Sequence, residues 1–269
     1  MTVTFKKAPL VEMIAELRWG EAQPVQPNVP TIMHGMGADL DQFFMSFGGE
    51  VYQHGFRRAE RLVPPGFPVF PFQPVYRYRR ESSDDTAVLF QVGSGLFSAN
   101  AMPPYRSWKN VSPTVKTGVD SLLKVRLTGE KDKTFSLLSL RYINAFGPEL
   151  TEGRSIAPFM REILGFELGF PQVIVEQVDP GSSITPQIQF KVPLVGGASL
   201  AFLVGEGAIN NEPKIIVDMT VTNTQPIFPD ADAIMAAFTT ARDVIHHVFL
   251  RLIKPIETLL QPDGDESDS

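Results

Sequence analysis

The sequence predicts an α+β fold built from two similar modules in tandem. Two segments recur in the same order, since Phe90–Gly95 resembles Phe202–Gly207 and Leu17–Trp19 resembles Leu140–Tyr142. Apolar residues alternate with a period of two in several stretches, as in strands, and recur every three or four residues in others, as in helices. We therefore expect modules at residues 1–129 and 130–262, followed by an acidic disordered tail at 263–269.

Each module is predicted to run strand, helix, three strands, helix, with antiparallel sheets. In the first module we expect strands at 8–19, 74–80, 86–92 and 96–102 and helices at 31–47 and after Trp108. In the second we expect strands at 134–146, 184–193, 198–205 and 213–223, a helix at 155–166 and a long C-terminal helix. Two such units can bury their sheets in a shared core and leave a cleft between them.

Local signals mark the ends of several elements. Asp230 is a good N-cap for the last helix, and Pro255 is expected to kink or end it. Gly93-Ser94-Gly95 and Gly205-Glu206-Gly207 resemble pieces of nucleotide-binding loops, but each lacks the third glycine and the strand-to-helix context. We predict that both are hairpin turns.

Composition limits the class of protein. Hydrophobic residues make up 43% of the 269 residues and charged residues 20%, as in soluble globular proteins. Cysteine is absent, which rules out disulfides, thiolate zinc sites and a cysteine nucleophile and fits a cytoplasmic protein. No stretch approaches the roughly 20 apolar residues of a membrane span, so we expect no membrane contact.

Charge is distributed unevenly along the chain. Residues 1–129 carry 14 basic and 11 acidic side chains, whereas the remainder carries 10 basic and 19 acidic ones. The two halves could attract each other in a homo-oligomer, and salt would weaken such an assembly. The net charge of −6 argues against nonspecific binding to nucleic acid.

A local basic patch keeps RNA or DNA binding open as an alternative. Tyr76 and Tyr78 alternate with Arg77, Arg79 and Arg80, and aromatic and guanidinium groups can stack on bases. The competing interpretation is an exposed edge strand protected by charge, and we favour it over nucleic-acid contact.

Two carboxylate or histidine patterns are candidates for catalysis. Glu12 and Glu16 share a strand face but lie about 13 Å apart, beyond the roughly 5 to 9.5 Å of glycosidase pairs. A solvated face with Arg18 as charge partner explains them better. Asp243 and His246 have helical spacing that suits a general base and its orienting group, although a structural role is favoured. His246 and His247 diverge on a helix and do not suggest a metal site.

Several segments together resemble a family of sporadically distributed bacterial proteins of unknown function. The matching pieces span nearly the whole chain: Ala8–Glu12, Leu17–Trp19, Leu89–Val92, Asn100, Tyr105–Trp108, Leu140–Asn144, Asp243, His246 and Phe249. The run Arg141-Tyr142-Ile143-Asn144 is the most specific of them. The resemblance implies a bacterial or phage-borne cytoplasmic protein, scattered among genomes as mobile or defence-linked genes are, and it supplies no catalytic residues.

These observations lead to three functional hypotheses. The first is a noncatalytic binding or interaction module with a protein or small-molecule partner, for which the site residues would be Glu12, Arg141, Asn144, Asp243 and His246. The second is a hydrolase or nuclease-like enzyme that uses Asp243 and His246 with Arg141 or Glu12. The third is a nucleic-acid-binding protein that uses the arginines of the first half. We expect no cofactor and no metal.

Overall fold

One continuous antiparallel sheet forms the frame of the structure. The computed structural model describes residues 4–20, 37–81, 88–103 and 107–262. Within these ranges the sheet has nine strands in the order β2-β3-β4-β5-β1-β6-β9-β8-β7. Their bounds are β1 Leu10–Arg18, β2 Arg58–Arg61, β3 Pro74–Arg79, β4 Val88–Gly93, β5 Leu96–Ala101, β6 Leu137–Phe146, β7 Ile188–Pro193, β8 Ala198–Ile209 and β9 Glu212–Asn223.

The strand order mirrors itself about the central pair. β1 and β6 lie side by side, with Ala15 opposite Leu140. Moving outward from β1 the strands are β5, β4 and β3, and moving outward from β6 they are β9, β8 and β7. The mirror is incomplete, because β2 pairs with the outer side of β3 while β7 is an edge of the sheet.

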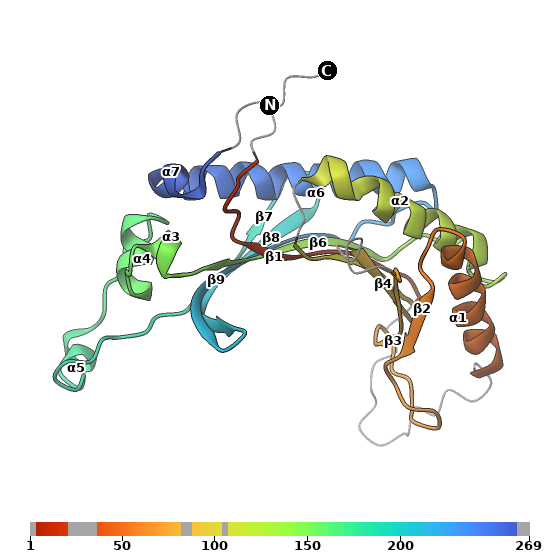
Figure 1. The fold of residues 1–269 in the computed structure, drawn as a ribbon, viewed down its shortest axis with the longest axis horizontal. Helices are drawn as coiled ribbons and strands as arrows, with labels where there is room; N and C mark the ends of the chain where they lie inside the picture. The colour runs from red at the N-terminus through yellow and green to blue at the C-terminus, as the bar shows by residue number, and fades with distance from the viewer. Residues whose placement is uncertain (1–3, 21–36, 82–87, 104–106, 263–269) are drawn as a thin grey trace.

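Helices cover one face of the sheet. Figure 1 shows the sheet as an arch, with α2 and α6 along its convex side and α1 outside the limb that carries β3. The helices are α1 Gly37–Tyr52, α2 Trp108–Val125, α3 Pro148–Thr151, α4 Ile156–Glu162, α5 Gln172–Val175, α6 Ala231–Leu252 and α7 Glu257–Leu260, with a 3-10 turn at Lys254–Ile256. An α+β fold is therefore confirmed, while the division into modules at residue 129 stays a prediction.

The alternation of side chains along each strand decides which of them face the helices. On β9, Ile215, Val217, Met219 and Val221 are buried on the convex side, as their alternation predicts. On α6, Ile234, Phe238, Ala241 and Ile245 form the buried stripe. The predicted cap is confirmed, because the Asp230 side chain accepts a hydrogen bond from the Ala233 amide. The helix ends at Leu252, before Pro255.

Aromatic rings fill the core beneath α1 and α2. Phe47 packs edge-on against Phe90 and Phe97, with ring centroids 6.2 and 5.9 Å away. Gly118 of α2 lies over the same two rings, where a Cβ atom would come within 2.6 Å of Phe90 and 2.8 Å of Phe97. The missing side chain allows the helix to approach the sheet closely.

Three expectations need correction. The modules do not form two sheets with a cleft between them, because one sheet runs through both halves. Gly205 and Gly207 are not in a turn but inside β8, and the hairpin turns at Asn210 and Asn211, which have φ of 52° and 65°. Asparagine tolerates this left-handed conformation better than most residues. β3 is not an edge strand, because β2 covers it.

Some expectations concern residues outside the described ranges. These are the start of the helix at 31–47, Tyr105, and the tail at 263–269. Among the helices in the described ranges, none has both the length and the apolar character needed to cross a bilayer.

Candidate functional site

A pocket lies on the convex side, where the N-terminal segment and the first turn of α2 meet α6. Its cavity volume is about 70 Å³, and the empty space between its walls and at its open mouth comes to about 590 Å³. Four parts of the chain supply its walls: Thr4, Phe5, Ala8, Pro9 and Leu10; Ser107 and Trp108; Tyr142 and Asn144; and Arg242, Ile245, His246 and Phe249.

Local geometry explains why these segments converge. Arg242, Ile245, His246 and Phe249 recur at intervals of three and four on α6, so they share one face of the helix. An irregularity in the β1–β6 pairing, between Leu10 and Glu12, lets the chain before β1 leave the plane of the sheet. The pocket therefore forms at the place where β1 begins.

His246 is the most unusual group in this pocket. Its Nε2 atom is buried and has no hydrogen-bond partner among the described residues. Burial, and then the neighbouring charge of Arg242, lower the pKa of His246 from 6.5 to about 4. The imidazole is therefore neutral at pH 7, with one nitrogen able to donate a hydrogen bond and the other able to accept one.

Asn144 and Trp108 add polar groups to the same walls. Asn144 is buried in β6. Among the described residues its side chain makes one hydrogen bond, a long one of 3.4 Å in which Nδ2 donates to the Val217 carbonyl. The Trp108 indole donates to the Thr239 hydroxyl at 3.2 Å. Asn144 therefore bonds to a strand carbonyl rather than to a loop, and its side chain keeps further hydrogen-bonding capacity.

Asp243 does not make the contact with His246 that the catalytic hypothesis requires. Its carboxylate is exposed and pairs with the Arg242 guanidinium at 2.9 Å, and among the described residues no hydrogen bond joins it to His246. The Arg242 side chain is only 13% exposed and lines the pocket. Asp243 therefore does not line the pocket itself but pairs with Arg242, which does.

Glu12 and Arg141 lie on the opposite face of the sheet. Arg141 grips Asp218 of β9 through Nε, at 3.0 and 2.9 Å from its two carboxylate oxygens. Glu12 accepts a hydrogen bond from Asn100 at 2.8 Å. Residues 141 and 144 are an odd number of positions apart in one strand, so their side chains point to opposite faces.

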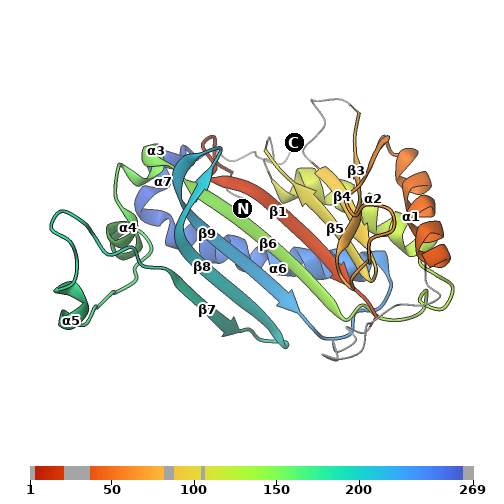
Figure 2. The same cartoon turned by 90° about the horizontal axis from the view of Figure 1, so that it is seen from below.

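The concave face carries a second hollow, around Arg141. Its cavity volume is about 440 Å³, and its polar lining includes Glu16, Arg18, Ser139, Asp218 and Thr220 beside apolar residues. Figure 2 looks at this face from below, with β1 and β6 running through its middle. As predicted, Arg18 is the charge partner of Glu16, at 2.7 Å. The five predicted site residues are therefore divided between two faces.

The arginine and tyrosine stretch of β3 is mostly engaged within the fold. The Tyr78 hydroxyl donates to the Phe44 carbonyl at 2.7 Å, and burial raises the pKa of Tyr78. Arg77 pairs with Glu60 at 3.5 Å, and the Arg80 guanidinium lies 5.1 Å from the Phe56 ring. Arg79 is exposed. Tyr78 is thus unable to stack on a base without leaving the core.

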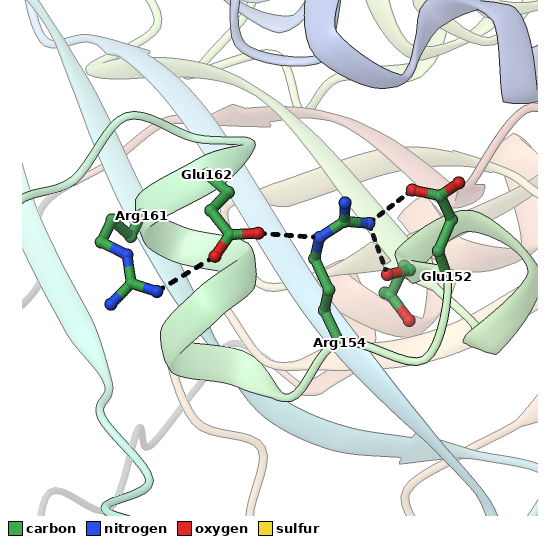
Figure 3. A network of polar contacts seen from close by, with 5 residues as sticks. Glu152, Arg154, Arg161 and Glu162 are labelled. Carbon is green, nitrogen blue, oxygen red and sulfur yellow. Dashed lines mark hydrogen bonds and ion pairs between the residues drawn. The ribbon is translucent and has the colours of Figure 1, made fainter.

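Other polar clusters serve the scaffold. Figure 3 shows Arg154 between Glu152 and Glu162, with Arg161 also reaching Glu162. The Arg154 and Arg161 guanidinium groups lower the pKa of Glu162. This network joins α3 to α4 at the surface. Among the described residues, no group of three or more histidine or acidic side chains gathers at metal-binding distance.

Comparison with known proteins adds no relative to this picture: no family model and no curated protein matches the chain. The family resemblance noted from the sequence stays a prediction. What the geometry offers is a pocket with largely apolar walls, a neutral imidazole and an amide. Such a combination suits the binding of a small molecule.

Proposed function

We propose that the chain is a noncatalytic binding protein that holds a small molecule in the pocket beside α6. The observation that carries this proposal is the buried Nε2 of His246, which no described residue satisfies. A buried polar atom without a partner costs roughly 1–3 kcal/mol and calls for an explanation. A ligand that hydrogen-bonds to His246 would recover that cost.

The walls suggest the chemistry of the ligand. Phe5, Pro9, Leu10, Ile245 and Phe249 are apolar, so most of the ligand surface should be apolar as well. The polar groups favour one neutral hydrogen-bonding function, such as an amide, a ring nitrogen or a hydroxyl. Arg242 is already paired with Asp243, so a charged group on the ligand is not required.

Geometry also favours binding over the enzymatic alternative. A general base needs an orienting partner and a reacting group within about 3 Å. The Asp243 carboxylate is paired with Arg242, while Arg141 and Glu12 are on the other face of the sheet from His246. These four residues therefore do not make a catalytic group in this arrangement.

We infer in addition that the two halves arose by duplication. The mirrored strand order about β1 and β6 supports this, as does the position of the recurring segments. Phe90 lies in β4 and Phe202 in β8, and these strands hold matching places in the two halves. A cytoplasmic location and a link to mobile or defence genes remain expectations from the family resemblance.

A paired extraction tests the binding proposal. Wild-type protein and an Ala8→Trp variant are purified side by side from the same native host, denatured, and their extracts compared by mass spectrometry. Ala8 is an exposed residue on the pocket wall, so the indole should fill the pocket without replacing a core residue. We expect one small molecule to be released by the wild type and to fall at least about tenfold in the variant.

A Met45→Trp variant serves as the control, because Met45 is an exposed residue on α1 that does not line the pocket. It should release as much ligand as the wild type. Equal release by wild type and Ala8→Trp, or no released molecule from either, would contradict the proposed function.

A further inference from the structure

The segment that leads into β7 packs Phe166 and Leu168 against the core but leaves many of its other apolar side chains exposed. From Gly165 to Pro193 no residue is buried. Within this segment the short helix α5 exposes 67% of Val173, 50% of Ile174 and 41% of Val175. Figure 2 shows α5 projecting beyond the end of the sheet. We call residues 165–187 the arm.

The edge strand next to the arm is exposed in a similar way. On its convex side β7 carries Ile188, Phe190 and Val192, of which Phe190 and Val192 are each 38% exposed. Phe190 stacks on Phe202 of β8 at 5.2 Å and meets Phe166 of the arm edge-on at 5.9 Å, but the outer side of β7 has no covering strand among the described residues. Free edges and large apolar patches are features that soluble monomers normally avoid.

Comparison of the two halves of the sheet shows that the outer side of β7 lacks a covering strand among the described residues. In the first half β2 covers the outer side of β3, while the matching side of β7 has no strand among the described residues. In chain order, β2 lies between α1 and β3, and the arm occupies the corresponding place between α4 and β7. The arm therefore holds the position in chain order that β2 holds in the first half, but it does not pair with the outer side of β7.

We propose that a second copy of this chain covers this edge, with two β7 strands paired antiparallel about a two-fold axis. The exposed apolar residues of each arm then pack against the partner. The arm, which supplies apolar residues, and the β7 edge, which receives them, belong to the same chain. Each copy can therefore offer both surfaces to the other, as a closed symmetric dimer requires. The proposal is independent of the ligand pocket.

The residues of β7 are self-complementary in one register. With Phe190 opposite its own copy, Ile188 faces Val192 on the convex side and Gln189 faces Lys191 on the concave side. This register gathers the apolar residues on one face and keeps the two lysines from facing each other directly. A shift by two residues would place Lys191 opposite its copy.

Seven large apolar residues of the arm, of β7 and of the turn after it are each at least 38% exposed: Phe170, Val173, Ile174, Val175, Phe190, Val192 and Val195. A stable interface buries about 800 Å² on each partner, and the backbone of a paired strand adds to the side-chain area.

Mass measurement in solution is the first test. Sedimentation or light scattering should give twice the 29.8 kDa chain mass. The Ile174→Asp variant of the arm should raise the dimer dissociation constant at least about a hundredfold, because a charge would enter an apolar contact. Met45→Asp, which changes an exposed apolar residue on α1, should leave the dimer unchanged.

Crosslinking tests the register, and the absence of native cysteine makes it clean. Single Phe190→Cys chains should form a disulfide with each other under mild oxidation, whereas Gln189→Cys chains should not, since residue 189 faces 191. A wild-type mass of one chain would overturn the proposal. Failure of Phe190→Cys to crosslink, or faster crosslinking of Gln189→Cys, would overturn the paired β7 edge.

Discussion

The guanidinium carbon of Arg126 lies 4.5 Å from the centroid of the Phe135 ring. The Trp19 ring is 5.4 Å from the same carbon, and one nitrogen donates to the Lys133 carbonyl at 2.9 Å. The other two nitrogens are buried without a hydrogen-bond partner in the part of the chain that the structure describes, and burial lowers the pKa of Arg126. The end of α2 is thus fixed by a cation between two aromatic rings.

This arrangement predicts that the volume of Arg126 matters more than its charge. Arg126→Ala should lower the free energy of unfolding by about 3 kcal/mol, because it opens a cavity in the core. Arg126→Met should stay within about 1 kcal/mol of the wild type, since it keeps the stem and removes an incompletely paired charge. Urea denaturation measures both. If methionine costs as much as alanine, the cation itself stabilises the fold.

Substitution of His246 should change folding stability and ligand binding in opposite directions. In ligand-free protein, His246→Phe should raise the free energy of unfolding by up to about 1 kcal/mol, because it removes an unsatisfied polar atom from an apolar pocket. The same change should abolish retention of the extracted ligand. His247→Phe alters the exposed neighbour and should change neither property. Loss of stability in His246→Phe would mean that the imidazole has a partner in the folded protein.

The depressed pKa of His246 also predicts a pH dependence. The unfolded chain takes up the proton near pH 6.5 and the folded chain only near pH 4, so protonation favours unfolding between these values. Stability should therefore be complete above pH 6.5 and fall as the pH drops towards 4. Allowing for partial exposure, we expect a loss of about 1–2 kcal/mol.

Comparison with His246→Phe isolates this effect, since carboxylates titrate in the same way in both proteins. Unfolding free energies measured between pH 7 and pH 4 should fall less steeply in the variant. Parallel pH profiles for the two proteins would show that His246 is solvated in the folded state.

Two glycines in helices should respond in opposite ways to alanine. Gly49 of α1 has open space where a Cβ would lie, so Gly49→Ala should stabilise by about 0.5–1 kcal/mol through helix propensity. Gly118→Ala would press against the Phe90 and Phe97 rings and should destabilise by about 1–3 kcal/mol. Thermal unfolding of the two variants gives the comparison, and stabilisation by Gly118→Ala would indicate a looser α2 contact.

Most helices and strands can be predicted from the regular spacing of apolar residues in the sequence. The alternation of Ile215 to Val221 and the cap at Asp230 depend on neighbouring residues only, and both hold in the structure. The sequence pattern misplaces the turn after β8, because Gly205 and Gly207 resemble a turn while Asn210 and Asn211 make it. The joining of all strands into one sheet depends on long-range pairing that local patterns do not encode.

The candidate site was predictable only in part. Asn144 and His246 were singled out, and they do line one pocket, but Arg141 and Glu12 were grouped with them although strand periodicity sends 141 and 144 to opposite faces. Arg242 was missed, because its closeness to the pocket depends on how α6 is rotated against the sheet. Nothing in the local sequence indicates that two aromatic rings enclose Arg126, because Trp19 and Phe135 come from other parts of the chain.

The central position of β1 has a consequence for synthesis. This strand leaves the ribosome before the other described strands, yet it pairs with β5, which ends at Ala101, and with β6, which ends at Phe146. One edge of β1 therefore stays open while the ribosome adds the residues between β5 and β6. An open strand edge of this kind promotes association with other nascent chains. β1 thus precedes the other described strands in synthesis but gains its second neighbour only when β6 is made, and chains that terminate before residue 137 should aggregate.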